Sequence, residues 1–317
     1  MKPLKRVLLI VIISISICQI TFLLFRYGSK KYGSHKHERL NELLQNNTHH
    51  DLILVGSSIV HCGMNPRIID SICNISTYNA GVEGGNLLEF KMIFDAYLVN
   101  HPPPNYLMLT LDLTSFSLDR KFFNHLDYYP FLSNKVVDRV LCNNGHETAL
   151  VKILPFIELI EYDEEMRSRC VKGLLDKNEI MPGQIEYKGF LTHSMKFHYD
   201  NPKINSYFTD EIVSDGSLNL FQAIRDTCNT RNIMMIINFP PVYQKEGQNN
   251  IINSGKIYKM ICSLANDYKI DFLDHNKLDI CTDSSLFVDF THLNTDGADL
   301  YSVILAKELL GLIRNPE

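Results

Sequence analysis

The chain has 317 residues, of which 45% are hydrophobic and 21% are charged. This composition excludes a disordered or collagen-like chain, and at about 150 residues per domain the length allows two domains or one large one. The 31 Lys and Arg residues against 36 Asp and Glu residues give a net charge of −5. Because no basic block follows the N-terminus, nucleic-acid binding through a broad cationic face is not expected.

The first predicted element is a membrane-spanning helix within residues 1–25. Residues 7–25 read VLLIVIISISICQITFLLF and carry no charge. As a helix they span about 28 Å, close to the ~30 Å hydrocarbon core of a bilayer. A cleaved signal peptide is the alternative, but its apolar region is usually about 7–15 residues long. The longer run therefore favours an uncleaved signal-anchor, whose orientation stays open because basic residues flank both ends.

Residues 26–50 are rich in Lys, His, Asn and Gln and are expected to form a polar stalk. The histidines in this segment have no regular spacing, so they predict no metal site. The cysteines are scattered without a C-x-x-C pair, which indicates buried free thiols and argues against a zinc knuckle. One or two disulfides stay open if the domain is exported.

Short apolar runs alternate with helical patterns over residues 51–317. The expected strands lie within residues 51–58, 75–81, 106–113, 233–239 and 271–274. The expected helices lie near residues 65–73, 86–101, 217–230, 254–268 and 295–313. This alternation predicts an α/β domain, a three-layer α/β/α sandwich around a parallel five-stranded sheet. Ligands of such folds bind at the carboxyl ends of the strands.

Residues 114–216 interrupt this alternation. The interval holds aromatic-rich stretches such as KFFNHLDYYPFL and the helix-like run TALVKILPFIELI. We expect it to be an insertion beside the active face of the same domain and not an independent domain.

Three loops at predicted strand ends hold residues suited to nucleophilic catalysis. Ser57 and Ser58 follow the first strand, the glycine-rich NAGVEGG (79–85) follows the second, and DFTHLN (289–294) precedes the last helix. Asp289 can reach Nδ1 of His292, which leaves Nε2 free to take a proton from a serine. Each pattern is common by itself, but the three loops are expected to converge at one edge of the sheet.

With VGSSIVHCGMNP (55–66), NAGVEGG and DFTHLN, the chain resembles the SGNH/GDSL esterase superfamily. It looks most similar to the branch of membrane-anchored D-alanyl-lipoteichoic acid acyltransferase-like and polysaccharide O-acetyl-modifying proteins. The resemblance implies a flavodoxin-like fold, a nucleophile at Ser58 with Ser57 in place of the family's Asp, and a triad completed by Asp289 and His292. It also implies oxyanion donors at the backbone N–H groups of Ser58 and Gly84, and neither a cofactor nor a metal.

One block departs from the family pattern. The family's third block, G-x-N-D, supplies an Asn side chain as a third oxyanion donor, but here the third strand ends in TLDLTSF (110–116). Thr114 or Ser115 stands near that position, and Thr114, Ser57 and Asn238 are candidate pocket residues. Asp112 occupies a position where that branch often has an acidic residue, without an evident role.

The sequence therefore favours a membrane-anchored serine esterase or O-acyltransferase. Its substrate is expected to be an acetyl or similar ester of a cell-envelope glycan or lipid, outside the cytoplasmic membrane, with a membrane-bound acyl-transfer partner as an option. The alternative is a non-catalytic SGNH-fold scaffold or binding protein of an envelope polysaccharide-modification system.

Overall fold

The computed structural model describes residues 2–32, 34–117, 125–177, 186–195, 213, 215–244 and 254–314. The chain forms two compact units, each built from two stretches of sequence. The first unit holds Met1–Gln45 and Asn124–Pro182, and the second holds Asn46–Phe123 and Gly183–Glu317. The central sheet belongs to the second unit.

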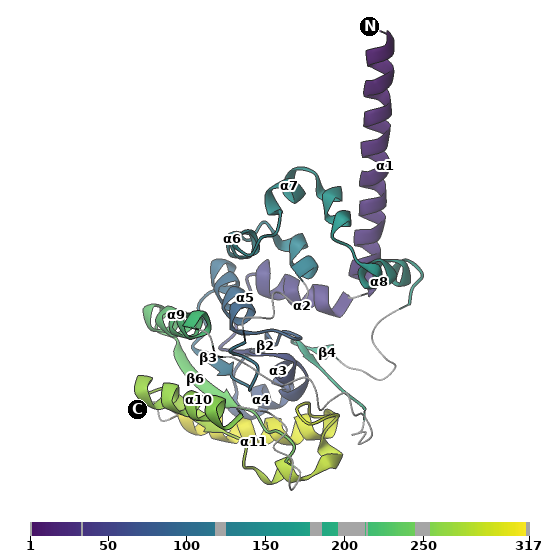
Figure 1. The fold of residues 1–317 in the computed structure, drawn as a ribbon. Helices are drawn as coiled ribbons and strands as arrows, with labels where there is room; N and C mark the ends of the chain where they lie inside the picture. Colours follow the sequence, from purple (N-terminus) through teal and green to yellow (C-terminus); the bar gives the residue numbers. More distant parts are fainter. Residues whose placement is uncertain are drawn as a thin grey trace. The chain divides into compact units, whose positions relative to one another are not determined.

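The sheet has five parallel strands in the order β2-β1-β3-β6-β7 (Figure 1). Its strands are β1 (Leu52–Val55), β2 (Thr77–Asn79), β3 (Tyr106–Thr110), β6 (Met234–Phe239) and β7 (Asp271–Asp274). All four residues of β1 are buried, as expected for a strand covered on both faces. Full burial of each such aliphatic side chain contributes about 1.5–3 kcal/mol. β2 lies on one side of β1, whereas β3, β6 and β7 follow on the other side, so the order of strand addition reverses between β1 and β3. Doubly wound folds bind ligands at this point.

Helices cover both faces of the sheet and confirm the predicted three-layer sandwich. Leu52 and Leu54 of β1 pack in one cluster with side chains of α4 and α11, so these helices cover one face. Helix α5 packs against α9, and Phe221 of α9 lies 6.1 Å from the ring of Tyr268 in α10. The helices of this unit are α3 (Ser58–Gly63), α4 (Pro66–Cys73), α5 (Leu87–Asn100), α9 (Asp215–Arg231), α10 (Ser254–Tyr268) and α11 (Thr295–Arg314).

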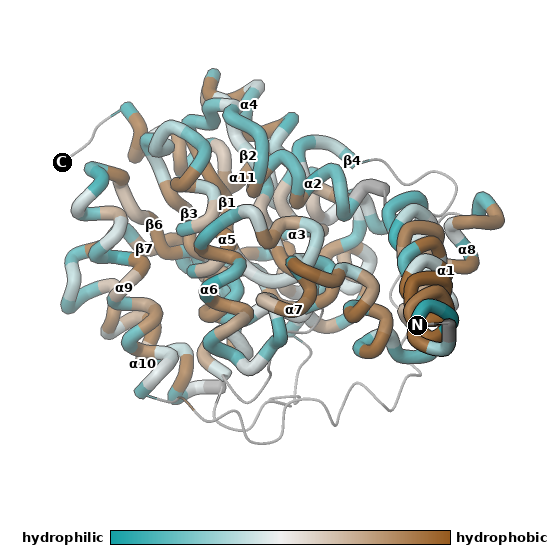
Figure 2. The backbone as a smooth tube through the Cα atoms, turned by 90° about the horizontal axis from the view of Figure 1, so that it is seen from above, coloured by the Kyte–Doolittle hydropathy of each residue, from teal (hydrophilic) through white to brown (hydrophobic). Residues whose placement is uncertain are grey.

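Helix α1 (Lys2–Tyr32) begins the first unit and is long and apolar enough to cross a membrane. Its apolar side chains are exposed over most of its length, and Figure 2 shows the helix as predominantly hydrophobic. A signal sequence near an N-terminus can meet the same criterion of length and hydropathy.

The segment expected to be a polar stalk is helical. Residues 26–32 continue α1, and α2 (Ser34–Leu44) follows. Leu40, Leu43 and Leu44 are buried, at an i, i+3, i+4 spacing that gives α2 an apolar stripe. The polar composition of residues 26–50 hides this short stripe, and the expectation of a solvated stalk rested on that composition.

The described part of the expected insertion at 114–216 divides between the two units. In the first unit lie η1 (His125–Phe131), α6 (Lys135–Asn143), α7 (Thr148–Ile153), η2 (Pro155–Ile160) and α8 (Glu164–Leu174). The antiparallel pair β4 (Glu186–Tyr187) and β5 (Phe190–Leu191) and the start of α9 belong to the second unit. Residues 118–124, 178–185, 196–212 and 214 lie outside the described residues.

Helix α8 packs tightly against α1 where two glycines meet. A Cβ atom added at Gly173 would overlap the backbone oxygen of Gly28, and one added at Gly28 would overlap the backbone oxygen of Cys170. Above this crossing the rings of Phe25 and Tyr162 stack at 6.4 Å. Only glycine allows the two backbones to come this close.

We therefore expect Gly173→Ala to destabilise the first unit by about 1–3 kcal/mol, because the overlap involves backbone atoms that cannot move aside. The matched control is Gly311→Ala in α11, where an added Cβ meets open space and alanine should stabilise the helix by up to about 1 kcal/mol. Thermal unfolding in detergent measures both changes. Equal effects of the two substitutions would contradict the close crossing of α1 and α8.

Candidate active site

The proposed nucleophile lies in the turn between β1 and α3. Ser57 caps α3, and Ser58 is its first residue. A Cβ atom at Gly56 would lie 2.5 Å from Val60 and 3.1 Å from Thr110 at the end of β3, so glycine lets this turn approach the neighbouring strand. The turn therefore holds Ser58 at the carboxyl edge of the sheet.

Ser58, His292 and Asp289 form one hydrogen-bonded chain. The Oγ atom of Ser58 lies 2.8 Å from Nε2 of His292, and Nδ1 of His292 lies 2.8 Å from Oδ2 of Asp289. The backbone N–H groups of Thr291 and His292 both donate to Oδ1 of Asp289 at 2.8 Å and fix the carboxylate. With Nδ1–H donating to Asp289, Nε2 is the acceptor for the serine proton.

The pKa values of this pair favour an ionised Asp289 and a basic His292. Burial alone would raise the pKa of Asp289, but the hydrogen bond and charge of His292 and the backbone donors outweigh it and lower the pKa to about 2. Burial would lower the pKa of His292, but the hydrogen bond and charge of Asp289 outweigh it, and Asp112 and Glu83 add to the rise. His292 is therefore a stronger base than an ordinary histidine.

A cleft of about 630 Å³, including the part open to solvent, adjoins Ser58 and His292. Gly84 borders it with a φ of +63°, a conformation that favours glycine. Among the described residues no intramolecular acceptor takes the backbone N–H of Ser58 or of Gly84. The lining residues are Ser57, Ser58, Ile59, Gly84, Gly85, Asp112, Leu113, Thr114, Phe239, Val242, Thr291 and His292.

Asp112 occupies the position beside the missing third block and organises this corner. Its Oδ2 accepts a hydrogen bond from Oγ of Ser57 at 2.6 Å. Its Oδ1 accepts from the backbone N–H and the hydroxyl of Thr114 at 2.7 and 2.8 Å, and from the Ser115 hydroxyl at 3.1 Å. Thr114 thus lines the cleft, but both its donors serve Asp112, so it does not stand in for the absent Asn.

Asn238, expected as a pocket residue, belongs to a buried network instead. It is fully buried, and its Oδ1 accepts from the Tyr301 hydroxyl at 3.1 Å and lies 2.8 Å from Nδ1 of His275. Its amide donates to Thr110 Oγ1 at 3.2 Å. The cleft is bordered by the next residue, Phe239, because side chains alternate along β6.

Sequence reasoning missed the role of Asn79. Its amide donates to the carbonyls of Val60 and Met64 at 2.7 and 2.8 Å, and its Oδ1 accepts from the N–H of Gly81 at 3.0 Å. This fully buried side chain ties the end of β2 to α3, and so to the helix that begins with Ser58. Asn79 is the first residue of NAGVEGG, and a polar residue at the end of a buried strand is the sequence signal for this role.

Comparison with known proteins gives distant structural likenesses. No protein-family model and no curated protein matches the sequence. An acetyl xylan esterase has 11% identity and a TM-score of 0.43, over 83% of this chain and 99% of that one. An acetylxylan esterase from Geobacillus stearothermophilus, a catalytic mutant, has 11% identity and a TM-score of 0.41 over 84% and 96%. A protein assigned to the lipolytic G-D-S-L family, from Desulfitobacterium hafniense, has 10% identity and a TM-score of 0.37 over 82% and 99%.

The contact between His292 and Asp289 predicts a titration that can be measured without a substrate. We expect the imidazole pKa of His292 to lie above 6.5 and to fall in Asp289→Asn, because the carboxylate stabilises the protonated ring. Histidine NMR across a pH series measures it, with the signal assigned by its loss in His292→Gln. The control Asp283→Asn should leave the value unchanged, since Asp283 bonds Ser285. A pKa that does not respond to Asp289→Asn would contradict the pairing.

Proposed function

We propose that this chain is a serine esterase of the SGNH type that works through an acyl-enzyme on Ser58. The observation that carries the proposal is the hydrogen-bonded chain from Ser58 through His292 to Asp289, beside an open cleft. The motifs around these residues, which resemble the SGNH/GDSL blocks, support the same assignment.

The geometry supports a two-step acyl transfer. Oγ of Ser58 attacks the ester carbonyl carbon while Nε2 of His292 takes the hydroxyl proton. The negative charge that develops on the carbonyl oxygen is held by the backbone N–H groups of Ser58 and Gly84. When the tetrahedral intermediate collapses, His292 gives the proton to the leaving alcohol oxygen. Water or an acceptor hydroxyl then attacks the acyl carbonyl carbon while His292 takes its proton. The bond to Oγ of Ser58 breaks, and His292 returns the proton to that oxygen.

The oxyanion hole in this proposal has two backbone donors and lacks the third. Among the described residues that line the cleft, Thr114 stands nearest the missing block, and its N–H and hydroxyl both donate to Asp112. One such donor typically contributes about 10²–10³ in kcat. We therefore expect slower turnover than in an enzyme with three donors, as long as no partner supplies a third hydrogen-bond donor.

The same proposal places the enzyme at a membrane. Helix α1 would serve as an uncleaved anchor and leave the catalytic unit on the extracytoplasmic side. An ester of an envelope glycan or lipid is the substrate class that such a location suggests. Transfer to a sugar hydroxyl and hydrolysis by water start from the same acyl-enzyme, so competition between water and an added sugar acceptor distinguishes a transferase from a hydrolase.

A non-catalytic scaffold is the second candidate, and the missing Asn donor favours it. An active-site-directed fluorophosphonate separates the two. We expect the wild-type protein to be labelled and Ser58→Ala to lose the label completely. The control Ser285→Ala should keep it, because the exposed Ser285 hydroxyl donates to Asp283 and Ser285 does not line the cleft. A wild-type protein that neither takes the label nor hydrolyses short acyl esters would contradict the esterase.

The pH dependence of kcat/KM follows from the His292 pKa. His292 must be unprotonated to accept the serine proton, and its pKa is raised above the ordinary histidine value of 6.5. Below that raised pKa, kcat/KM should therefore fall tenfold per pH unit. Asp289, with a pKa of about 2, stays ionised throughout this range. Asp289→Asn should lower kcat on the order of 10⁴-fold, whereas Asp283→Asn should not change it. A pH-independent rate between pH 5 and about 8 would be inconsistent with a histidine base.

A further inference from the structure

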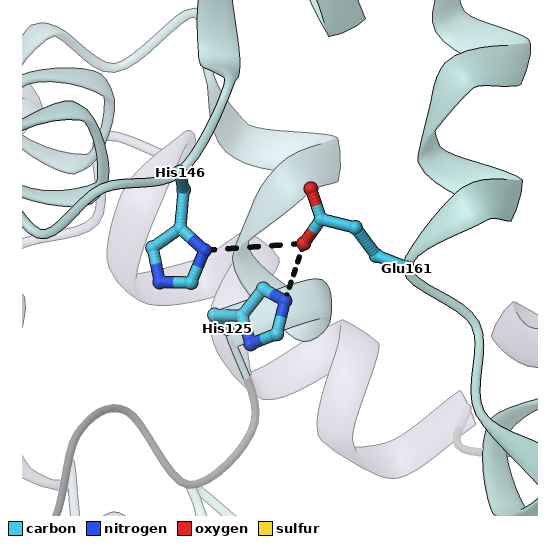
Figure 3. A group of neighbouring side chains, drawn as sticks. All are labelled: His125, His146 and Glu161. Atoms are coloured by element: carbon cyan, nitrogen blue, oxygen red, sulfur yellow. Dashed lines mark hydrogen bonds and ion pairs between the residues drawn. The ribbon is translucent and has the colours of Figure 1, made fainter.

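Three metal-ligating side chains meet in the first unit, in a cluster that the esterase chemistry does not use. His125 begins η1, His146 lies in the turn between α6 and α7, and Glu161 follows η2 (Figure 3). Nε2 of His125 lies 2.7 Å from Oε2 of Glu161, and Nδ1 of His146 lies 3.9 Å from the same oxygen. All three ligand atoms lie within 4.8 Å of one another.

We propose that His125, His146 and Glu161 bind one Zn²⁺ ion. Two imidazole nitrogens and one carboxylate oxygen form a donor set that zinc commonly takes, with the fourth position open to water. Ligand atoms about 2.0–2.1 Å from a tetrahedral zinc ion lie about 3.3 Å apart. The separations of the two histidine nitrogens from Oε2 of Glu161, 2.7 and 3.9 Å, lie on either side of that value, and all three ligand atoms lie within 4.8 Å of one another. Side-chain adjustments on the order of 1 Å therefore bring the cluster to the spacing of a coordination site.

A buried tyrosine orients the carboxylate for this role. The Tyr129 hydroxyl donates to Oε1 of Glu161 at 2.6 Å, which directs Oε2 toward the two histidines. Tyr129 is itself buried, so this hydrogen bond holds the carboxylate in place, as an outer-shell partner of a metal ligand does.

The side chains of the cluster are partly buried and partly open to solvent. The side chains of His125, His146 and Glu161 are 26%, 18% and 29% exposed. A water molecule can thus reach the fourth position from solvent. The two imidazole rings stack at 4.2 Å with an interplanar angle of 21°. Because a ligating nitrogen directs its lone pair in the plane of its ring, one of the two rings must turn before both nitrogens point at a shared ion.

Zinc would join three short segments that have little regular structure of their own. The 3-10 helices η1 and η2 and the turn before α7 lack the long hydrogen-bond ladders that stabilise α-helices. A shared ion would hold all three segments together. This inference is independent of the proposed esterase, whose residues lie in the other unit.

The test uses the full-length protein in detergent, stripped with a chelator and titrated with ZnCl₂ by isothermal calorimetry. We expect one equivalent to bind, and Co²⁺ in its place to give the visible absorption of a four-coordinate ion. The double variant His125→Ala/His146→Ala and the nearly isosteric Glu161→Gln should each lose the site. The control His49→Ala, which removes an exposed histidine outside the cluster, should bind as the wild type does.

Tyr129→Phe supplies a graded readout. We expect it to keep the one-to-one stoichiometry and to weaken Zn²⁺ binding by about 10–100-fold, as loss of an outer-shell partner does. Circular dichroism of the stripped variants checks that they are folded. Unchanged Zn²⁺ binding in Glu161→Gln, or no binding by the wild-type protein, would overturn the proposal and leave the cluster as a hydrogen-bonded network.

Discussion

The buried carboxylate of Asp112 connects two of the loops that form the candidate active site, the turn after β1 and the loop after β3. One of its oxygens accepts from Ser57, next to the proposed nucleophile, and the other accepts from Thr114 and Ser115 in the loop after β3. Its negative charge also contributes to the raised pKa of His292. A buried carboxylate is costly unless it is hydrogen-bonded, and these donors satisfy it. The same bonds therefore hold the ends of β1 and β3 together and set the position of Ser58.

The parallel order of the sheet explains why such distant residues meet. Ser58 follows β1, Gly84 lies after β2, Asp112 follows β3, and all three border one cleft. His292 reaches the same cleft from the loop before α11. Asn79 adds a second fixed point, since its buried amide donates to the carbonyl of Val60 within α3 and to that of Met64, which follows the helix. The site is thus built on strand ends, with each loop tied to a neighbour by a side-chain hydrogen bond.

The sequence predicts the sheet and the Ser58, His292 and Asp289 chain well, because apolar strand runs and short local motifs carry that information. It does not predict Asp112 as the organising carboxylate, since its partners depend on how two strand ends pack. Asn238 was misplaced because a strand-end position does not reveal the face to which the side chain points. The polar composition of residues 26–50 hides the buried stripe of α2. The cluster around Glu161 is not evident from the sequence because its three residues come from separate segments of the chain.

If Ser58 is the nucleophile, it carries the acyl group during turnover, and rapid-quench mass spectrometry can detect that group. Wild-type protein is mixed with p-nitrophenyl acetate, quenched in acid within the first turnover and digested. We expect one acetyl group on the peptide that contains Ser58, formed as fast as p-nitrophenol is released. Release of p-nitrophenol with no acetyl group on Ser58, or with the acetyl group on another residue, would show that Ser58 is not the nucleophile.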